Sequence, residues 1–96
     1  MSPKNKNKLN LVRKKLDKLD NKLMKLIKIR TNLVNEVVKL KQYKKEIVDK
    51  KRIAIILKKI RKKSIVKGID PKITNRIWKN MIWSYIDYER KIFNKK

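Results

Sequence analysis

Arginine is scarce in this chain, and its placement gives the first indication of chemistry. Only six of the 31 basic residues are arginine. Arg30 follows Leu16 and Leu23 at seven-residue steps and precedes Val37 by seven. On a helix its side chain would therefore share a face with these apolar residues. A guanidinium turned toward an apolar interior needs an anionic partner, because burying an unpaired charge costs on the order of several kcal/mol.

Further charged residues fall in or beside the apolar positions. Arg13 and Lys41 occupy a register next to that of Arg30, Arg52 adjoins an apolar run, and Glu89 follows Tyr85 by four residues. For any one of them, an internal salt bridge or a stem lying along apolar surface is an equally good explanation. The set is harder to explain in this way, because eight carboxylates face 31 cations. Arginine binds carboxylates through two parallel hydrogen bonds, so these positions favour a ligand that carries carboxylates.

Composition excludes several kinds of site. The chain has neither cysteine nor histidine, which rules out disulfides, thiol chemistry and imidazole catalysis, and makes a zinc site and any other metal cofactor unexpected. A single glycine leaves no glycine-rich phosphate loop. No apolar run approaches the roughly 18 residues of a membrane span, and the first residues lack the pattern of a secretory signal. A cytoplasmic location is therefore expected.

The formal charge of +23 is also compatible with a different class of function, that of a non-catalytic helical dimer that binds nucleic acid. Lysine, isoleucine and asparagine supply 25, 14 and 9 of the 96 residues, so the charge reflects a bias of the whole chain. A strong nucleic-acid prediction would need basic residues on one side with aromatic residues between them. The lysines instead surround the predicted helices, and four of the six aromatic residues fall within 78–88. Nucleic acid remains the less favoured partner.

A long helix is the first element that the sequence predicts. Apolar residues recur at steps of three and four with one gap at position 30: Leu9, Val12, Leu16, Leu19, Leu23, Leu26, Leu33, Val37 and Leu40. We call these residues the apolar stripe. It predicts a helix of about 35 residues and about 50 Å, which is too long for two shorter helices of the same chain to cover. A homodimer is therefore expected, with residues 1–8 as a disordered end and 9–96 as one helical domain.

Two shorter helices follow. Asp49 is a suitable N-cap for the second, which carries Ile53, Ile56, Leu57 and Ile60 and ends before Gly68. Asp70 and Pro71 suit the N-cap and first residue of the third. Its apolar side is expected to hold Ile73, Ile77, Trp78, Met81, Tyr85 and Ile92. No strand is predicted, so the fold class is all-α with one long and two shorter helices.

In order along the chain, these motifs resemble the AroQ-type chorismate mutases. The likeness covers roughly residues 9–92 and is carried by Leu19-Asp20-x-x-Leu23, Leu26-Ile27-x-x-Arg30-x-x-Leu33, Glu36-Val37-x-x-x-Lys41, Asp49-x-x-Arg52, Gly68-Ile69-Asp70-Pro71, Ile77-Trp78 and Met81-Ile82. The resemblance implies an intertwined all-helical homodimer without a cofactor. It also implies the Claisen rearrangement of chorismate, a dianion, to prephenate on the route to aromatic amino acids.

The resemblance also implies roles for individual residues. Arg13 would bind a substrate carboxylate from the partner chain, and Arg30 would bind one within its own chain. Lys41 and Glu89 would face the ether oxygen, where negative charge grows as the C–O bond breaks. Asp49 and Arg52 would form the second-helix side of the pocket. Such catalysis combines positioning of one conformer with electrostatic stabilisation.

Two departures resemble the isochorismate pyruvate lyases, which share this fold and form salicylate. Ile53 stands where typical mutases carry an acid that binds the ring hydroxyl, and Tyr85 stands where a serine is typical. The aromatic residues around Trp83 also resemble the lyase cluster, although core or dimer packing explains Trp78 and Tyr85 more simply. The mutase is the first expectation and the lyase the second, with an inactive mutase fold also open.

Overall fold

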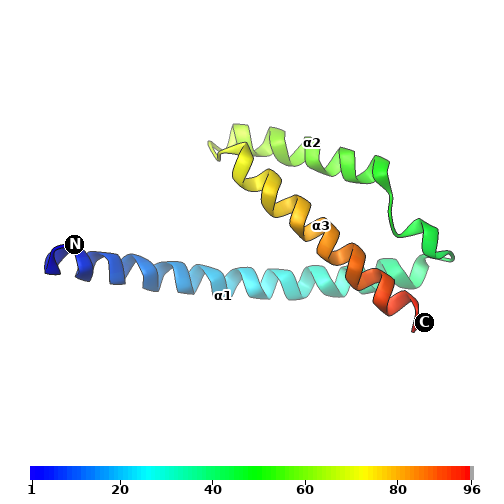
Figure 1. Ribbon diagram of the computed structural model, residues 1–96, viewed down its shortest axis with the longest axis horizontal. Coiled ribbons are helices and arrows are strands. Elements are labelled where there is room, and N and C mark those ends of the chain that lie inside the picture. The colour runs from blue at the N-terminus through cyan, green and yellow to red at the C-terminus, as the bar shows by residue number, and fades with distance from the viewer. Residues whose placement is uncertain (96) are drawn as a thin grey trace. The chain divides into compact units, whose positions relative to one another are not determined.

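The computed structural model describes residues 1–95, and its secondary structure is entirely helical. The elements are α1 (Pro3–Leu40), a short 3-10 helix η1 (Lys44–Glu46), α2 (Lys50–Val66) and α3 (Pro71–Phe93), and Figure 1 shows them in this order. No strand occurs within the described residues. The predicted all-α class with one long and two shorter helices is confirmed. The chain divides into two compact units, Met1–Leu33 and Val34–Lys96.

The first unit is the greater part of α1. The helix begins at Pro3, six residues before the apolar stripe and within the segment expected to be disordered. Ser2 explains this start, because its Oγ accepts a hydrogen bond of 3.2 Å from the backbone N–H of Asn5. Pro3 then occupies the first helical position, where its fixed φ suits a helix and its missing N–H costs nothing.

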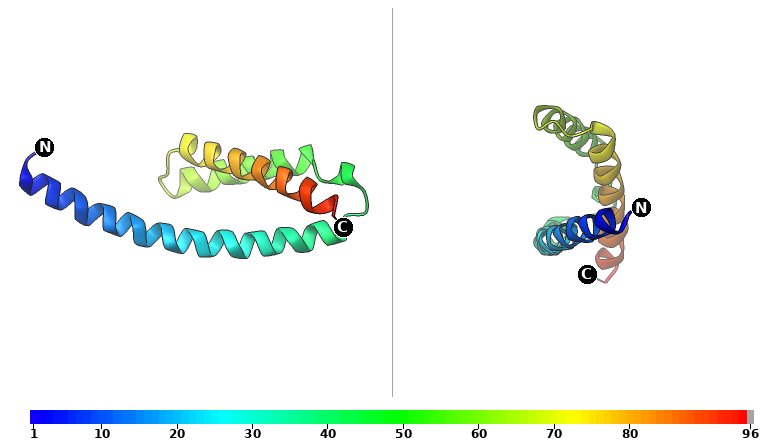
Figure 2. Two further views of the ribbon diagram at one scale, coloured as in Figure 1. Left: turned by 60° about the horizontal axis from the view of Figure 1, so that its bottom comes forward. Right: turned by 90° about the vertical axis from the view of Figure 1, so that its left-hand side faces the viewer.

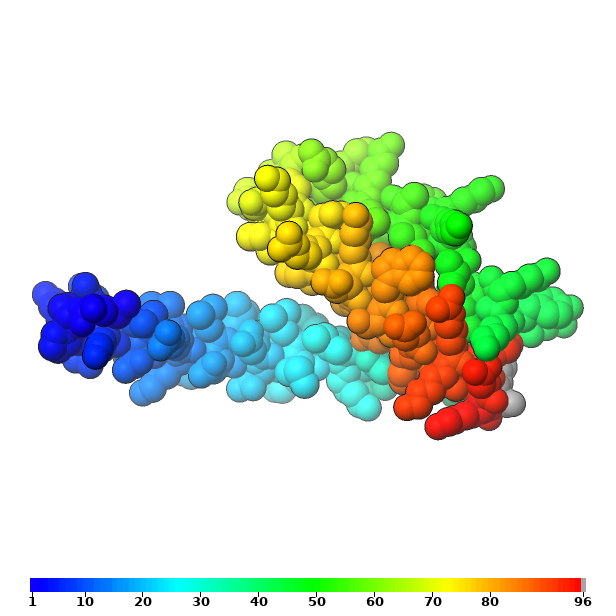
Figure 3. Space-filling view, in the orientation of Figure 1, coloured from blue at the N-terminus to red at the C-terminus, as the bar shows by residue number. Residues whose placement is uncertain are grey.

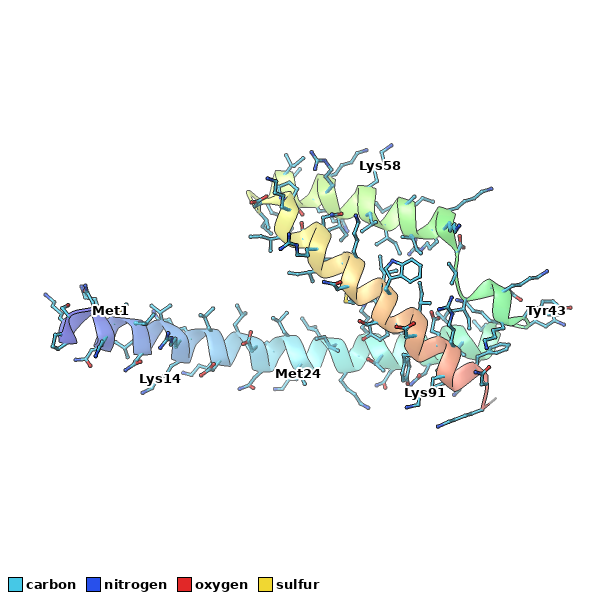
Figure 4. The ribbon with its side chains drawn as sticks, viewed as in Figure 1. Met1, Lys14, Met24, Tyr43, Lys58 and Lys91 are labelled. Carbon is cyan, nitrogen blue, oxygen red and sulfur yellow. The ribbon has the colours of Figure 1, made fainter. Side chains whose placement is uncertain are left out.

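The apolar stripe is uncovered within this unit, because no second element of the unit packs on the helix. Leu16, Leu19 and Leu23 are 52%, 53% and 48% exposed, and Leu26 and Leu33 are 61% and 56% exposed. Figure 4 shows side chains projecting from α1 around the labelled Lys14 and Met24. Isolated surface leucines are ordinary, whereas a continuous exposed row of this length is typical of interaction surfaces.

In the second unit, α2 and α3 form an antiparallel hairpin (Figure 2). Asp49 caps α2 by accepting a 3.0 Å hydrogen bond from the Arg52 backbone N–H. Asp70 caps α3 by accepting one of 2.9 Å from the Lys72 N–H. Gly68 has φ +70°, which a residue with a side chain adopts only at a cost. Both predicted caps and the predicted glycine turn are confirmed.

A small apolar core holds the hairpin and the loop before it together. Ile47, Ile82 and Ile86 are buried, and the partly buried residues packed on them are Val48, Ile53, Ile56, Leu57 and Phe93. Figure 3 shows the surfaces of α2 and α3 in contact near the turn. Closer to the turn between α2 and α3, the buried Ser64 hydroxyl lies 2.6 Å from the Thr74 hydroxyl. It also donates a hydrogen bond of 2.6 Å to the Ile60 carbonyl.

The buried face of α3 overlaps only in part with the face expected from its apolar pattern. Of the six expected residues, four are half-buried: Trp78, Met81, Tyr85 and Ile92. Ile82, Ile86 and Glu89 are buried, whereas Ile73 and Ile77 are 57% and 51% exposed. The reason is that α3 turns a neighbouring face toward α2 and the loop, which leaves the two earlier isoleucines uncovered. Among the described residues, no helix combines the length and the apolar character needed to cross a membrane.

Candidate functional site

A largely buried ion pair lies at the centre of the candidate site. Lys41 Nζ is 3.3 Å from Glu89 Oε1, and the two side chains are 19% and 10% exposed. Lys41 follows directly on the last residue of α1, and Glu89 continues the buried face of α3 after Ile82 and Ile86. A buried carboxylate on an apolar face needs a partner, and Lys41 supplies one across 48 residues of sequence.

Two aromatic residues lie beside this ion pair on α3. Tyr88 Oη donates a 2.6 Å hydrogen bond to Asn35 Oδ1 on α1. The rings of Tyr85 and Tyr88 meet edge to face, with centroids 6.4 Å apart. The Tyr88–Asn35 bond and the Lys41–Glu89 pair therefore join the end of α1 to α3 at two points. Neither Asn35 nor Tyr88 was expected in the site, because no local sequence pattern indicates a hydrogen bond between helices that are far apart in the sequence.

A shallow hollow opens beside Lys41. It has a volume of about 630 Å³ and is lined by Lys41, Glu46, Val48, Asp49, Lys50 and Lys51. The loop here is shaped by η1, where the Tyr43 backbone N–H donates a 2.8 Å bond to Glu46 Oε1. Tyr43 itself is 55% exposed and projects from the loop (Figure 4). Five of the six lining side chains are charged, three basic and two acidic, so the hollow has a small excess of positive charge that favours an anionic ligand.

The remaining expected site residues differ in their surroundings. Asp49 uses one carboxylate oxygen to cap α2, so its first role is structural. The Arg52 side chain is exposed. Ile53 is half-buried and packs on the core of Ile47, Ile82 and Ile86, which makes it a packing residue.

The two remaining arginines belong to the unit Met1–Leu33. Arg13 is exposed and Arg30 is half-buried. Within the second unit, the structure thus brings Lys41 and Glu89 into direct contact and places Asp49 on the same hollow as Lys41. The described residues contain no cluster of three or more carboxylates able to hold a metal ion.

Comparison with known proteins agrees with this fold. A family model described as chorismate mutase type II matches residues 12–90. Neither a search of curated proteins nor one of solved structures gave a match. The match covers most of the chain, from the second turn of the apolar stripe to the residue after Glu89, so this chain belongs to the chorismate mutase type II family.

Proposed function

We propose that this protein is a chorismate mutase that rearranges chorismate to prephenate. The observation that carries the proposal is the largely buried Lys41–Glu89 pair, which joins the end of α1 to the last third of α3. It lies beside a hollow lined by three basic and two acidic side chains. In the reaction the ether C–O bond breaks while a C–C bond forms within one molecule. Nothing is oxidised and no group leaves, so the protein needs only to hold the reactive conformer and to stabilise the charge that develops.

Lys41 stabilises the ether oxygen in this mechanism. An ammonium group has three N–H donors, so Lys41 can keep its bond to Glu89 and direct another toward the oxygen that becomes negative. Glu89 fixes the ammonium group in the resting protein. When protonated, Glu89 donates a second hydrogen bond to the same oxygen. The largely buried setting strengthens both interactions compared with bulk water.

The arginines bind the two carboxylates of the substrate. Arg30 takes one of them by a bidentate pair, and Arg52 approaches from the start of α2. Asp49 supports that end of the pocket by capping the helix that carries Arg52. Arg13 completes the site from a second copy of the chain. Its exposed position on α1 supports this role, because its side chain is accessible to a partner.

The functional unit in this proposal is a homodimer joined along α1. The apolar stripe supports it, with Leu16, Leu19, Leu23, Leu26 and Leu33 each 48% to 61% exposed. The exposed Ile73 and Ile77 on α3 offer further apolar surface to a second copy. The four buried apolar residues found among positions 1–95, Val38, Ile47, Ile82 and Ile86, are few for a chain of this length, so burial between two copies would add most of the missing core.

Isochorismate pyruvate lyase activity is the second candidate, and the setting of Ile53 favours it. An acid that binds a ring hydroxyl is absent at this position, and Ile53 packs on the apolar core. The Tyr85–Tyr88 pair adds the aromatic surroundings that the resemblance to lyases implies. The lyase reaction would release pyruvate from isochorismate and leave salicylate.

Product analysis separates the two candidates. Purified protein is offered chorismate and isochorismate in separate reactions, and the products are resolved by chromatography. We expect prephenate from chorismate as the faster reaction. Salicylate and pyruvate as the faster products would assign the lyase instead, and no conversion of either substrate by a folded protein would exclude both.

A further inference from the structure

The outer surface of the α2–α3 hairpin carries a concentration of positive charge that the proposed catalysis leaves unused. Residues 58–86 contain nine lysines and arginines but one acid, Asp70. Asp70 is engaged as the N-cap of α3. The whole chain is rich in lysine, so the number of cations alone does not indicate a binding surface. The position of these residues on the helices is more informative.

Three basic residues are aligned along one face of α3. Lys72, Arg76, Lys79 and Trp83 follow one another at steps of four, three and four, which places them on one side of the helix. We call these four residues the basic column. All four are exposed, and Trp83 is 48% exposed. The column spans about 17 Å along the helix axis.

Polar and basic neighbours extend this column across the hairpin. A hollow of about 380 Å³ joins it to α2 and is lined by Leu57, Lys58, Arg61, Pro71, Lys72 and Asn75. Figure 4 shows Lys58 on α2, the other helix of this hairpin. A second depression, of about 320 Å³, follows the column itself and includes Asn75 and Asn80. Arg61 and Arg76 are two of the six arginines in a chain whose other cations are lysine.

We propose that the basic column and the adjoining Lys58 and Arg61 bind single-stranded nucleic acid. Lysine and arginine would contact successive phosphates, and the carboxamides of Asn75 and Asn80 have both donors and acceptors for base edges or sugars. Trp83 offers an exposed ring on which an unpaired base stacks, which a duplex would not present. The combination of aligned cations with an aromatic ring on the same face is what favours a single strand. This activity is separate from the proposed mutase activity, since none of these residues lies in the candidate site.

The test measures binding of a fluorescein-labelled 15-nucleotide oligo-deoxythymidine to the full-length protein by anisotropy over a range of salt concentrations. The variant Lys72→Gln/Arg76→Gln/Lys79→Gln removes three charges from the column. Lys14→Gln/Lys18→Gln/Lys22→Gln removes three from exposed positions of α1 and is its matched control. We expect the column variant to weaken binding at least tenfold and to reduce the log–log salt slope by about two, since each phosphate contact on a single strand contributes about 0.7. The control should stay within about threefold of the parent.

Trp83 gives a second, independent readout. Trp83→Ala should weaken binding about tenfold, whereas Trp83→Phe, which keeps an aromatic face, should lose much less. Circular dichroism and turnover of chorismate check that each variant is folded. Equal losses in the two triple variants would overturn the proposal, because binding would then follow net charge alone. An unchanged affinity in Trp83→Ala would overturn the stacking assignment. Retention of phosphatidylserine vesicles but not of the oligonucleotide would assign the surface to membranes instead.

Discussion

The Lys41–Glu89 pair is the residue-scale feature on which the proposed chemistry depends. Substitutions of the two residues are expected to have different effects, because Lys41 is always a donor and Glu89 donates only when protonated. Lys41→Met removes the donor and leaves Glu89 buried without its partner. We expect kcat to fall at least ~100-fold, the cost of losing a preorganised contact to the developing charge. Thermal unfolding is measured alongside, and an active Lys41→Met protein would contradict the mechanism.

Glu89→Gln replaces a donor that depends on protonation with a permanent one of similar shape. If Glu89 donates to the ether oxygen, kcat of the parent and of the variant should depend differently on pH, because only the variant carries a donor in every protonation state. The measurement is kcat against pH for both proteins. Identical profiles would limit Glu89 to its structural role as the partner of Lys41.

Arg30→Lys tests whether Arg30 binds a substrate carboxylate through two parallel hydrogen bonds. The substitution keeps the charge but loses the bidentate fork, so we expect kcat/KM to fall at least ~100-fold with helicity unchanged. Lys28→Arg, two residues away and exposed, is the matched control and should leave activity unaltered. Near-parental activity of Arg30→Lys would show that Arg30 does not hold a substrate carboxylate.

At this scale the sequence indicated Arg30, Lys41, Arg52 and Glu89 as unusual because charge fell in or beside apolar positions. It did not indicate which of them would meet. The contact between Lys41 and Glu89 joins residues 48 apart, and only the family resemblance placed them together. The Tyr88–Asn35 bond was missed for the same reason, since neither residue interrupts a pattern.

At the scale of the helix, the ends were predictable because capping is local chemistry. Asp49, Gly68, Asp70 and Pro71 each adopt the expected role. The early start of α1 could also have been read from Ser2-Pro3, which is an N-cap followed by a first-turn proline. The buried face of α3 could not be predicted from the sequence, because Ile73 and Ile77 fit the helical period as well as Ile82 and Ile86 do. Choosing between them requires knowing what packs on the helix.

The cap at Asp49 yields a prediction that separates structure from substrate binding. Asp49→Ala removes the acceptor for the Arg52 N–H and should lower the free energy of unfolding by about 1 kcal/mol. Asp49→Asn retains a good cap, so its stability should match the parent. Urea unfolding measures both. If the asparagine variant is stable but kinetically impaired, the carboxylate also acts on the substrate side of the pocket.

At the scale of the whole molecule, the exposed stripe on α1 makes the oligomeric state testable. Sedimentation equilibrium at micromolar concentration should give twice the chain mass of 11.7 kDa. Leu19→Lys/Leu26→Lys charges the centre of the stripe and should abolish both the dimer and the activity. Met24→Lys alters an exposed apolar residue that lies outside the stripe and serves as the control. A folded, active monomer would rule out a site completed by Arg13 of a second copy.

The conversion of chorismate to prephenate tests the central claim most directly. The experiment follows prephenate formation by the purified full-length protein, with the Lys41→Met protein and a protein-free reaction in parallel. We predict saturable formation of prephenate by the parent, far above the spontaneous rate, and its near loss in Lys41→Met. A folded parent protein that forms prephenate no faster than the protein-free reaction would contradict the account.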